Sequence, residues 1–323
     1  MKTKSLLVTL IVYSWILSAC QSALIPATAT ATTEPSTKTP VPTNTMVPTA
    51  TQVPTATPAM GDTRVSEADG MVQVYVPAGK FLMGTSNEQM ELMIAQHPDW
   101  KRGLIMHDLD GNEIIIEQPQ NSVSLDAFWM DQTEVTNAMF AQCVEAGECD
   151  EPYREGSYTR DIYYGNSEYN NYPVVWVGWI QARSYCEWVG RRLPTEAEWE
   201  KAARGTDERR YPWGEELSCD LANYGSSCVG DTSPVGSYPA GASPYGALDM
   251  AGNAFEWVNS LFANYPYEAG ASRENTTDTE NWRILRGGSW NTDGRAIRTA
   301  HRGASDPSMA RPDGGFRCAS NAE

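Results

Sequence analysis

Short runs in which apolar and polar residues alternate predict a domain of short β-strands. Pro77 to Lys80 has the composition of a turn between two such runs. The last run is interrupted at Gly287-Gly288, where the backbone can take a positive φ or pass close to a neighbouring segment. The predicted strands are 71–76, 81–84, 122–129 and the segment around Ile284 and Leu285.

Helical spacing predicts two helices in the middle of the chain. Thr136 is a suitable N-cap for a helix that runs through Cys143 and ends near Gly147. After Trp179, the side chains at 182, 185, 186 and 189 fall on one helical face, so that face is expected to be buried. Gly190 suits the position just after the helix.

A third helix has the clearest local signal. Thr195 and Glu198 form a capping box, in which each side chain bonds to the backbone N–H of the other residue. Trp199, Ala202 and Ala203 predict its buried face, and Gly205 ends it. Turns dominate the rest of the chain, and almost no further helix is expected.

Two segments have no regular pattern. Asp108 to Glu113 partly matches a calcium-binding loop, but the final glutamate ligand and flanking helices are missing. A hairpin turn at Asp110-Gly111 is therefore the preferred interpretation. Residues 150–170 are rich in Tyr, Gly, Asn and Asp and are predicted to be an exposed insertion.

The N-terminus is typical of a targeting segment. Lys2 and Lys4 precede an apolar run from Leu6 to Leu17, which is short for a membrane span. The run ends in Leu-Ser-Ala-Cys, which resembles a bacterial lipobox and predicts a signal peptide at 1–19 and a lipid on Cys20. The alternative is an ordinary secretory signal. Lipidation would place the protein in the cell envelope or at the cell surface, outside the cytoplasm.

The next segment, 20–62, is dominated by Thr, Pro and Ala and has few large apolar residues, so it is predicted to be a disordered, extended tether. The folded domain is predicted at 68–321. The formal net charge of −17 argues against a nucleic-acid partner, because phosphates would be repelled.

Export would favour disulfides. The chain has 7 Cys, and setting aside Cys20 leaves Cys143, Cys149, Cys186, Cys219, Cys228 and Cys318, which allow fifteen pairings. Local spacing favours Cys143–Cys149 and Cys219–Cys228, which would leave Cys186 for Cys318.

Eight motifs in a fixed order resemble the formylglycine-generating enzyme, or sulfatase-modifying factor, family. They are VPAGKFLMG, TEVTNAMF, RRLPTEAEWEKAARG, YPWG, TSPVGSYPA, GALDMAGNAFEW, RILRGGSW and GGFRC. The resemblance covers about residues 70 to 320 and implies an α+β, C-type-lectin-like fold with little regular secondary structure. It also implies a disulfide between Cys186 and Cys318.

Catalytic members of this family use copper and oxygen to oxidise a cysteine of a sulfatase to formylglycine. Copper(I) prefers thiolate ligands, which the family supplies as a cysteine pair. The corresponding positions are Thr292 and Ile297, so copper and this activity are not expected. A related branch uses iron bound by three histidines. The only histidines, His97, His107 and His301, have no paired helical spacing, so this chemistry is also not expected.

A family calcium loop matches GALDMAGNAFEW. The resemblance implies side-chain ligands from Asp249 and Glu256 and backbone carbonyl ligands from Gly252 and Ala254, which suits Ca²⁺. The alternative is that the two carboxylates cap turns or pair with arginines. A second family site maps to Asn223 and the carbonyl of Tyr224, with Asp231 as a candidate for its unmatched aspartate.

Non-catalytic members present the C-terminal loop as a binding surface, and some are diversified surface lipoproteins. By this resemblance the chain is expected to be a non-catalytic binding module whose 289–313 loop contacts a protein or small-molecule ligand. The alternatives are a formylglycine-generating oxidase and a structural envelope lipoprotein. The arginines could instead pair with carboxylates, and Trp290 could be core. The expected ligand residues are Ser289, Trp290, Asn291, Thr292, Asp293, Arg295, Arg298, His301 and Arg302.

Overall fold

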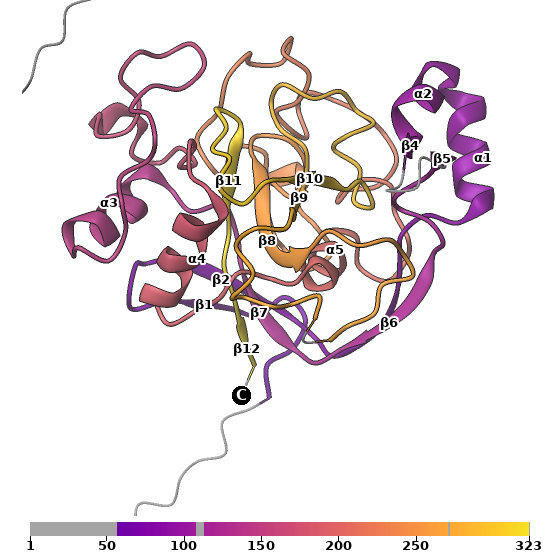
Figure 1. Cartoon of the computed structure of the whole chain (residues 1–323), viewed down its shortest axis with the longest axis horizontal. Helices are drawn as coiled ribbons and strands as arrows, with labels where there is room; N and C mark the ends of the chain where they lie inside the picture. Colours follow the sequence, from indigo (N-terminus) through magenta and orange to yellow (C-terminus); the bar gives the residue numbers. More distant parts are fainter. Residues whose placement is uncertain (1–56, 108–112, 271, 323) are drawn as a thin grey trace, which may run out of the picture. The chain divides into compact units, whose positions relative to one another are not determined.

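Two four-stranded sheets form the centre of the domain (Figure 1). The computed structural model describes residues 57–107, 113–270 and 272–322, so the predicted signal peptide, Cys20 and most of the tether lie outside the described residues. The first sheet has the order β1 (Thr63–Val65), β2 (Val72–Val76), β7 (Phe128–Asp131), β12 (Ala319–Asn321). The second has the order β10 (Gly303–Ser305), β9 (Arg283–Arg286), β8 (Phe255–Leu261), β11 (Gly314–Phe316).

All strand pairs are antiparallel except β11 with β8, which run parallel. Two small ribbons complete the strands: β3 (Gly79–Met83) pairs with β6 (Asn121–Leu125), and β4 (Met106–His107) pairs with β5 (Glu113–Ile114). Residues 314–321 supply an edge strand to each of the two larger sheets. This short segment therefore joins the two halves of the domain.

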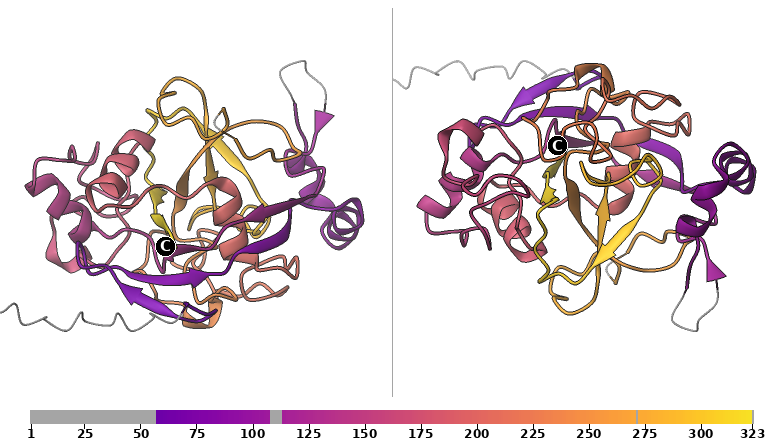
Figure 2. Two further views of the ribbon diagram at one scale, coloured as in Figure 1. Left: turned by 90° about the horizontal axis from the view of Figure 1, so that it is seen from below. Right: turned by 90° about the horizontal axis from the view of Figure 1, so that it is seen from above.

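The helices lie around the sheets, with α3 at one end of the domain and α1 and α2 at the other (Figures 1 and 2). The α-helices are α1 (Asn87–Gln96), α2 (Lys101–Leu104), α3 (Asn137–Glu145), α4 (Trp179–Trp188) and α5 (Glu196–Arg204). Single 3-10 turns occupy Pro98–Trp100, Ser167–Tyr169 and Pro239–Gly241. Within the described ranges, no helix is long and apolar enough to cross a bilayer.

The core is packed with tryptophans whose ring N–H groups are mostly satisfied. Trp179 donates to the carbonyl of Val258 at 2.9 Å, and Trp257 donates to the carbonyl of Val177 at 3.0 Å. These reciprocal bonds fix α4 against β8, because a buried indole N–H without a partner is unfavourable.

The three predicted helices are confirmed. Thr136 caps α3, Gly190 follows α4 with φ +71°, and the Thr195–Glu198 capping box of α5 is formed in both directions. All three predicted disulfides are present, Cys143–Cys149, Cys186–Cys318 and Cys219–Cys228.

Other predictions need correction. The predicted strand 122–129 is two strands, β6 and β7, that belong to different sheets. The insertion 150–170 is not wholly exposed, because Tyr163 is buried and stacks with Tyr169. Helix α1 and strand β8 were not predicted, since neither has a clean apolar period. β1 begins at Thr63, so the fold starts before residue 68. The Asp110-Gly111 turn lies outside the described residues, although the strands on either side of it do pair.

Candidate functional site

The two glycines after β9 fold the 289–313 loop back on itself. Gly287 and Gly288 have φ values of +86° and +69°, which most side chains disfavour. A Cβ at Gly288 would lie 2.7 Å from Cγ2 of Ile297 and 2.9 Å from Oγ1 of Thr292. The side chains of Thr292 and Ile297 therefore both lie close against the backbone of Gly288.

Thr292 is bonded within its own turn. Its hydroxyl donates to the carbonyl of Ser289 at 3.0 Å and accepts from the N–H of Ser289 at 2.9 Å. Ile297 is fully buried beside Tyr211 and Ala251. The two side chains beside Gly288 are thus a hydroxyl that is already hydrogen-bonded and a buried hydrocarbon.

Trp290 is not on the surface, which corrects the sequence-based expectation. Its side chain is 1% exposed, and its backbone N–H donates to the carbonyl of Asn253 at 3.0 Å. The ring of Tyr158 covers it at a centroid distance of 4.9 Å, and Tyr158 is itself 66% exposed. The aromatic group presented to solvent here is therefore Tyr158, from the 150–170 insertion.

The arginines at 298 and 302 are also internal. Arg298 donates to both carboxylate oxygens of Glu117, at 2.7 and 2.6 Å. Burial disfavours the ionised form of Glu117, but the Arg298 guanidinium outweighs it and lowers the pKa of Glu117 to about 2. Arg302 pairs in the same way with Glu196. Neither arginine is therefore part of the exposed surface of the loop.

His301 lies beside this buried pair. Burial, and then the guanidinium of Arg298, lower its pKa to about 3, so the imidazole is neutral near pH 7. His97 stacks on Trp100 near the end of α1, and the side chain of His107 lies outside the described residues. Within the described part of the chain, no three His, Cys, Asp or Glu residues group closely enough to hold a metal ion.

Few of the expected ligand residues are accessible. Asn291 and Asp293 are exposed, and Thr292 and Arg295 are half-buried. Asn291 accepts a hydrogen bond from the hydroxyl of Ser226 at 2.9 Å, and the N–H of Gly225 donates to the carbonyl of Thr292 at 2.7 Å. Ser289 is buried and donates to Asp313 at 2.9 Å. The expected ligand residues that are accessible thus lie at 291–295, beside the 225–226 turn, and farther along the same loop Asp306, Ser308 and Met309 are exposed as well.

The two carboxylates expected to bind calcium lie close together but have different partners within the protein. Arg317 binds both carboxylate oxygens of Glu256 at 2.7 Å, and the indole N–H of Trp199 donates to it at 2.7 Å. Asp249, at φ +55°, accepts from the N–H of Gly236 at 2.6 Å. Glu256 is therefore occupied by an internal cation, which corrects its expected role, whereas Asp249 is only partly engaged.

Glu134 is a third carboxylate in this cluster that sequence reasoning missed. Its Oε1 accepts from the amide of Asn253 at 3.0 Å, and its Oε2 is buried without a hydrogen-bond partner. Burial, and then the charge of Asp249, raise the pKa of Glu134 well above its usual value, and burial raises the pKa of Asp249. Three buried carboxylates here face the one guanidinium of Arg317.

The candidate Asp231 does not fit the second expected calcium site. The carboxylate of Asp231 accepts from Ser157 and Thr159, and Arg160 lies 3.2 Å away, so internal donors and a cation already satisfy it. Asn223 uses its amide N–H to bond the carbonyl of Asp231 at 2.8 Å, and its Oδ1 has no partner. The hydrogen-bond donors and the cation that satisfy the carboxylate of Asp231 thus come from the insertion 150–170.

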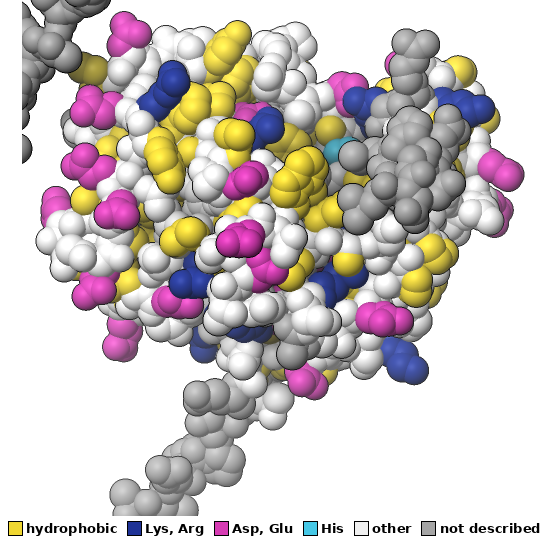
Figure 3. All heavy atoms as spheres, in the orientation of Figure 1, with side chains coloured by type: hydrophobic (Ala, Val, Ile, Leu, Met, Phe, Trp, Pro, Cys, Tyr) yellow, Lys and Arg dark blue, Asp and Glu magenta, His cyan; other side chains and the backbone are white. Residues whose placement is uncertain are grey.

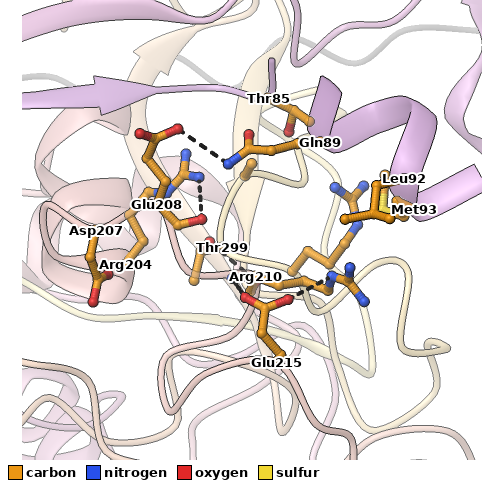
Figure 4. Close-up of a pocket in the computed structure, with 12 residues that line it drawn as sticks. Thr85, Gln89, Leu92, Met93, Arg204, Asp207, Glu208, Arg210, Glu215 and Thr299 are labelled. Carbon is orange, nitrogen blue, oxygen red and sulfur yellow. Dashed lines mark hydrogen bonds and ion pairs between the residues drawn. The ribbon is translucent and has the colours of Figure 1, made fainter. Parts of the chain in front are cut away.

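A cleft of about 320 Å³ lies on another side of the domain, between α1, the segment 207–215 and residues 298–300 (Figure 4). The residues that define it here are Gln89, Leu92, Met93, Glu208, Arg210 and Thr299, and we name it the Glu208 cleft. Figure 4 shows Glu208 and Gln89 pointing toward one another.

Comparison with known families decides the assignment. The family described as Sulfatase-modifying factor enzyme 1-like domain matches residues 57–322, which is most of the chain. The chain belongs to the sulfatase-modifying factor family.

Individual relatives of this family agree with the fold. The formylglycine-generating enzyme of Streptomyces coelicolor is 32% identical over 305 residues, covering 78% of this chain and 90% of that protein. The serine/threonine-protein kinase pkn1 of Chlamydia caviae is 35% identical over 260 residues, covering 76% of this chain and 37% of the kinase. The chain therefore spans well under half of that kinase.

The solved structure of PvdO from Pseudomonas aeruginosa superposes with a TM-score of 0.59 at 24% identity, covering 82% of this chain and 100% of that chain. This similarity concerns the fold alone. It agrees with the α+β, sulfatase-modifying factor fold that the motifs implied.

The family's copper chemistry does not fit the residues present. In the described residues every cysteine is in a disulfide, so no thiolate is available to a copper ion. The fold still places the two family positions against Gly288, but as a threonine and an isoleucine. No step of the family's oxidation can therefore be assigned to this site.

Proposed function

We propose that this protein is a non-catalytic binding module of the sulfatase-modifying factor family, anchored to the outer face of a membrane through a lipid on Cys20. Its ligand, a protein or a small molecule, contacts residues 291–295 and the ring of Tyr158. The observation that carries the proposal is that a threonine and an isoleucine, Thr292 and Ile297, lie against Gly288 at the two positions where a thiol pair would be required.

The surroundings of this surface support a binding role. Large exposed apolar side chains come from the adjacent 150–170 insertion, where Tyr153 is 62%, Tyr158 66% and Ile162 61% exposed. In Figure 3, apolar side chains gather on the upper part of the face, over the loops. Exposed aromatic groups beside polar loop residues are typical of protein interaction sites.

The wild-type protein is expected to leave a sulfatase-motif cysteine peptide unchanged in the presence of copper and oxygen, as measured by mass spectrometry. It is also expected to bind no copper(I) in competition with a chromogenic chelator. Because the two positions both lie against Gly288, the paired substitution Thr292→Cys and Ile297→Cys is expected to retain about one copper(I) per chain. An aldehyde formed by the wild type would overturn the proposal.

The binding surface is tested with exposed residues. Affinity capture on intact envelope fractions is compared for the wild type, Asn291→Ala with Asp293→Ala, and the control Asp126→Ala, which is exposed between β6 and β7. A partner retained by the control and lost by the loop variant supports the proposal. Equal recovery of every partner by all three proteins contradicts a role for this loop.

We also propose a revised calcium site. Glu256 is held by Arg317, so Asp249 and Glu134 are the carboxylates left for Ca²⁺, together with the backbone carbonyls of Gly252 and Ala254 that the family uses. Hard oxygen ligands suit this ion, and its charge would balance the excess of buried carboxylates.

Glu134→Gln is expected to raise thermal stability at pH 8 and to have little effect at pH 4, in buffer with a chelator. The pKa of Glu134 is raised in the folded protein, so Glu134 keeps its proton to a higher pH there than in the unfolded chain. The free energy of unfolding of the wild type therefore falls as the pH rises from about 4.5 through the raised pKa. Each pKa unit is worth about 1.4 kcal/mol, or about 3–6 °C in Tm for a domain of this size.

Added Ca²⁺ distinguishes neutralisation of the carboxylate cluster by a bound ion from neutralisation by Glu134→Gln. Adding Ca²⁺ at pH 8 is expected to raise the Tm of the wild type and to leave that of Glu134→Gln nearly unchanged. Equal stabilisation of both proteins would show that Glu134 is not a ligand. A Tm difference between the two that does not vary with pH would contradict the raised pKa.

A further inference from the structure

One wall of the Glu208 cleft is built by a part of the chain that the family motifs do not include. Helix α1 belongs to the segment between the VPAGKFLMG and TEVTNAMF motifs, and it stands at one end of the domain (Figure 2). Met90 and Met93 bury one side of α1 against Trp100 and Leu104. Gln89, Leu92 and Met93 then line the cleft opposite the 207–215 segment. The cleft therefore forms where this segment packs against the rest of the domain.

Glu208 is held in a strained backbone conformation at this position. Its φ is +61°, in the left-handed region, which costs a residue with a long side chain on the order of 1 kcal/mol. The buried guanidinium of Arg204 donates to the carbonyl of Glu208 at 3.1 Å and also pairs with Glu200 at 2.7 Å. The domain thus fixes the backbone that directs the Glu208 side chain to the cleft.

The carboxylate of Glu208 has amide partners and no cationic one. Its Oε2 accepts from the amide of Gln89 at 3.2 Å and from that of Gln120 at 2.9 Å. Among the described residues, no Lys, Arg or His forms an ion pair with Glu208. The two amides orient the carboxylate but leave its charge uncompensated.

The other charged groups of the cleft are already neutralised. Arg298 is bound by Glu117, Arg204 is paired with Glu200 at 2.7 Å, Asp207 is paired with Arg209 at 2.6 Å, and Arg210 lies 3.3 Å from Glu215. Among the described charged residues that line the cleft, Glu208 is therefore the one whose side chain forms no ion pair. The rest of its lining includes the apolar side chains of Leu92, Met93 and Ala300.

We propose that the Glu208 cleft binds an ammonium or guanidinium group carried on an apolar stem, with Glu208 as its counter-charge. A basic amino-acid side chain and a free diamine share this chemistry. The volume of about 320 Å³ is at the lower end of the range for small-ligand pockets, which suits a single side chain or a short diamine. This site is separate from residues 291–295, so either proposal can fail without the other.

The test is calorimetric titration of the full chain with defined probes. N-acetyl-lysine methylamide, N-acetyl-arginine methylamide and cadaverine carry the cation, and N-acetyl-norleucine methylamide is the neutral match. The cationic probes are expected to bind at least about tenfold more tightly than the neutral one, because hydrogen bonds to a charged group are the stronger kind. Binding by blocked amino acids alone identifies a polypeptide source, and equal binding of cadaverine identifies a free amine.

Two cleft variants and one control test whether Glu208 itself binds the cation. Glu208→Gln is expected to weaken binding of the cationic probes at least about tenfold and to leave the neutral probe unchanged. Leu92→Lys, which places a cation on the lining and leaves Glu208 intact, is expected to weaken binding as well. Glu91→Gln is the matched control, exposed on α1 outside the lining, and is expected to bind as the wild type does.

Three results would overturn the proposal: no cationic probe binds at millimolar concentration, the neutral probe binds as tightly as the cationic ones, or Glu208→Gln binds them as the wild type does. Melting curves for each variant accompany the titrations. If Glu208→Gln does not fold, Leu92→Lys and the neutral probe still decide the outcome.

Discussion

Replacing Arg302 with Ala is expected to lower the free energy of unfolding by about 3–5 kcal/mol, the usual cost of breaking a buried ion pair. Arg302 donates to both oxygens of Glu196 and to the carbonyl of Ile116, and its guanidinium lies 4.2 Å from the ring centre of Tyr265. Removing it leaves Glu196 with less of its counter-charge and opens a cavity. Equilibrium urea unfolding measures the loss.

Arg295 is the matched control for this prediction. It comes from the same loop, but its side chain is 26% exposed and lies 3.6 Å from the exposed Asp293. Exposed ion pairs contribute about 0–1 kcal/mol, so Arg295→Ala is expected to change the free energy of unfolding by less than about 1 kcal/mol. Equal losses for the two variants would mean that Arg302 is not part of a buried network.

The paired substitution Cys186→Ala and Cys318→Ala is expected to cost about 5 kcal/mol. The bridge joins residues 132 positions apart, and cross-linking so long a segment removes much entropy from the unfolded chain. It also ties α4 to the segment between β11 and β12. Urea unfolding under non-oxidising conditions measures the difference from the wild type.

The bridge Cys143–Cys149 serves as the internal comparison. It closes a separation of only 6 residues, so Cys143→Ala with Cys149→Ala is expected to cost about 2 kcal/mol. If the short bridge proves as important as the long one, chain entropy is not the main source of the stabilisation. Local strain or packing would then have to account for both values.

The features that could be predicted from sequence depend on short-range interactions. The Thr195–Glu198 capping box lies within 3 residues, and the periodic apolar face of α4 lies within one helix. The close approach at Gly288 was indicated by the glycine pair itself. Each of these is decided by neighbours that can be read in a single window of the chain.

The roles of the loop arginines could not be predicted, because their partners are remote. Arg298 is 181 residues from Glu117 in the sequence, and Arg302 is 106 residues from Glu196. Nothing local distinguishes these two from the half-exposed Arg295. The same holds for Glu134, which joins Asp249 only through the tertiary fold.

The cleft was missed for a related reason. Its walls come from α1, the end of α5 and the 289–313 loop, which are separated by more than 80 residues at each step. Helix α1 has a mixed polar and methionine-rich sequence, so its packing face is clear only from the buried Met90 and Met93. The positive φ of Glu208 has no sequence signature, because glycine would be expected there.

The position of residues 314–321 has a consequence for the order of folding. Until this segment docks, both large sheets lack an edge strand, Cys186 lacks Cys318 and Glu256 lacks the guanidinium of Arg317. A chain shortened before Gly314 is therefore expected to leave both sheets incomplete.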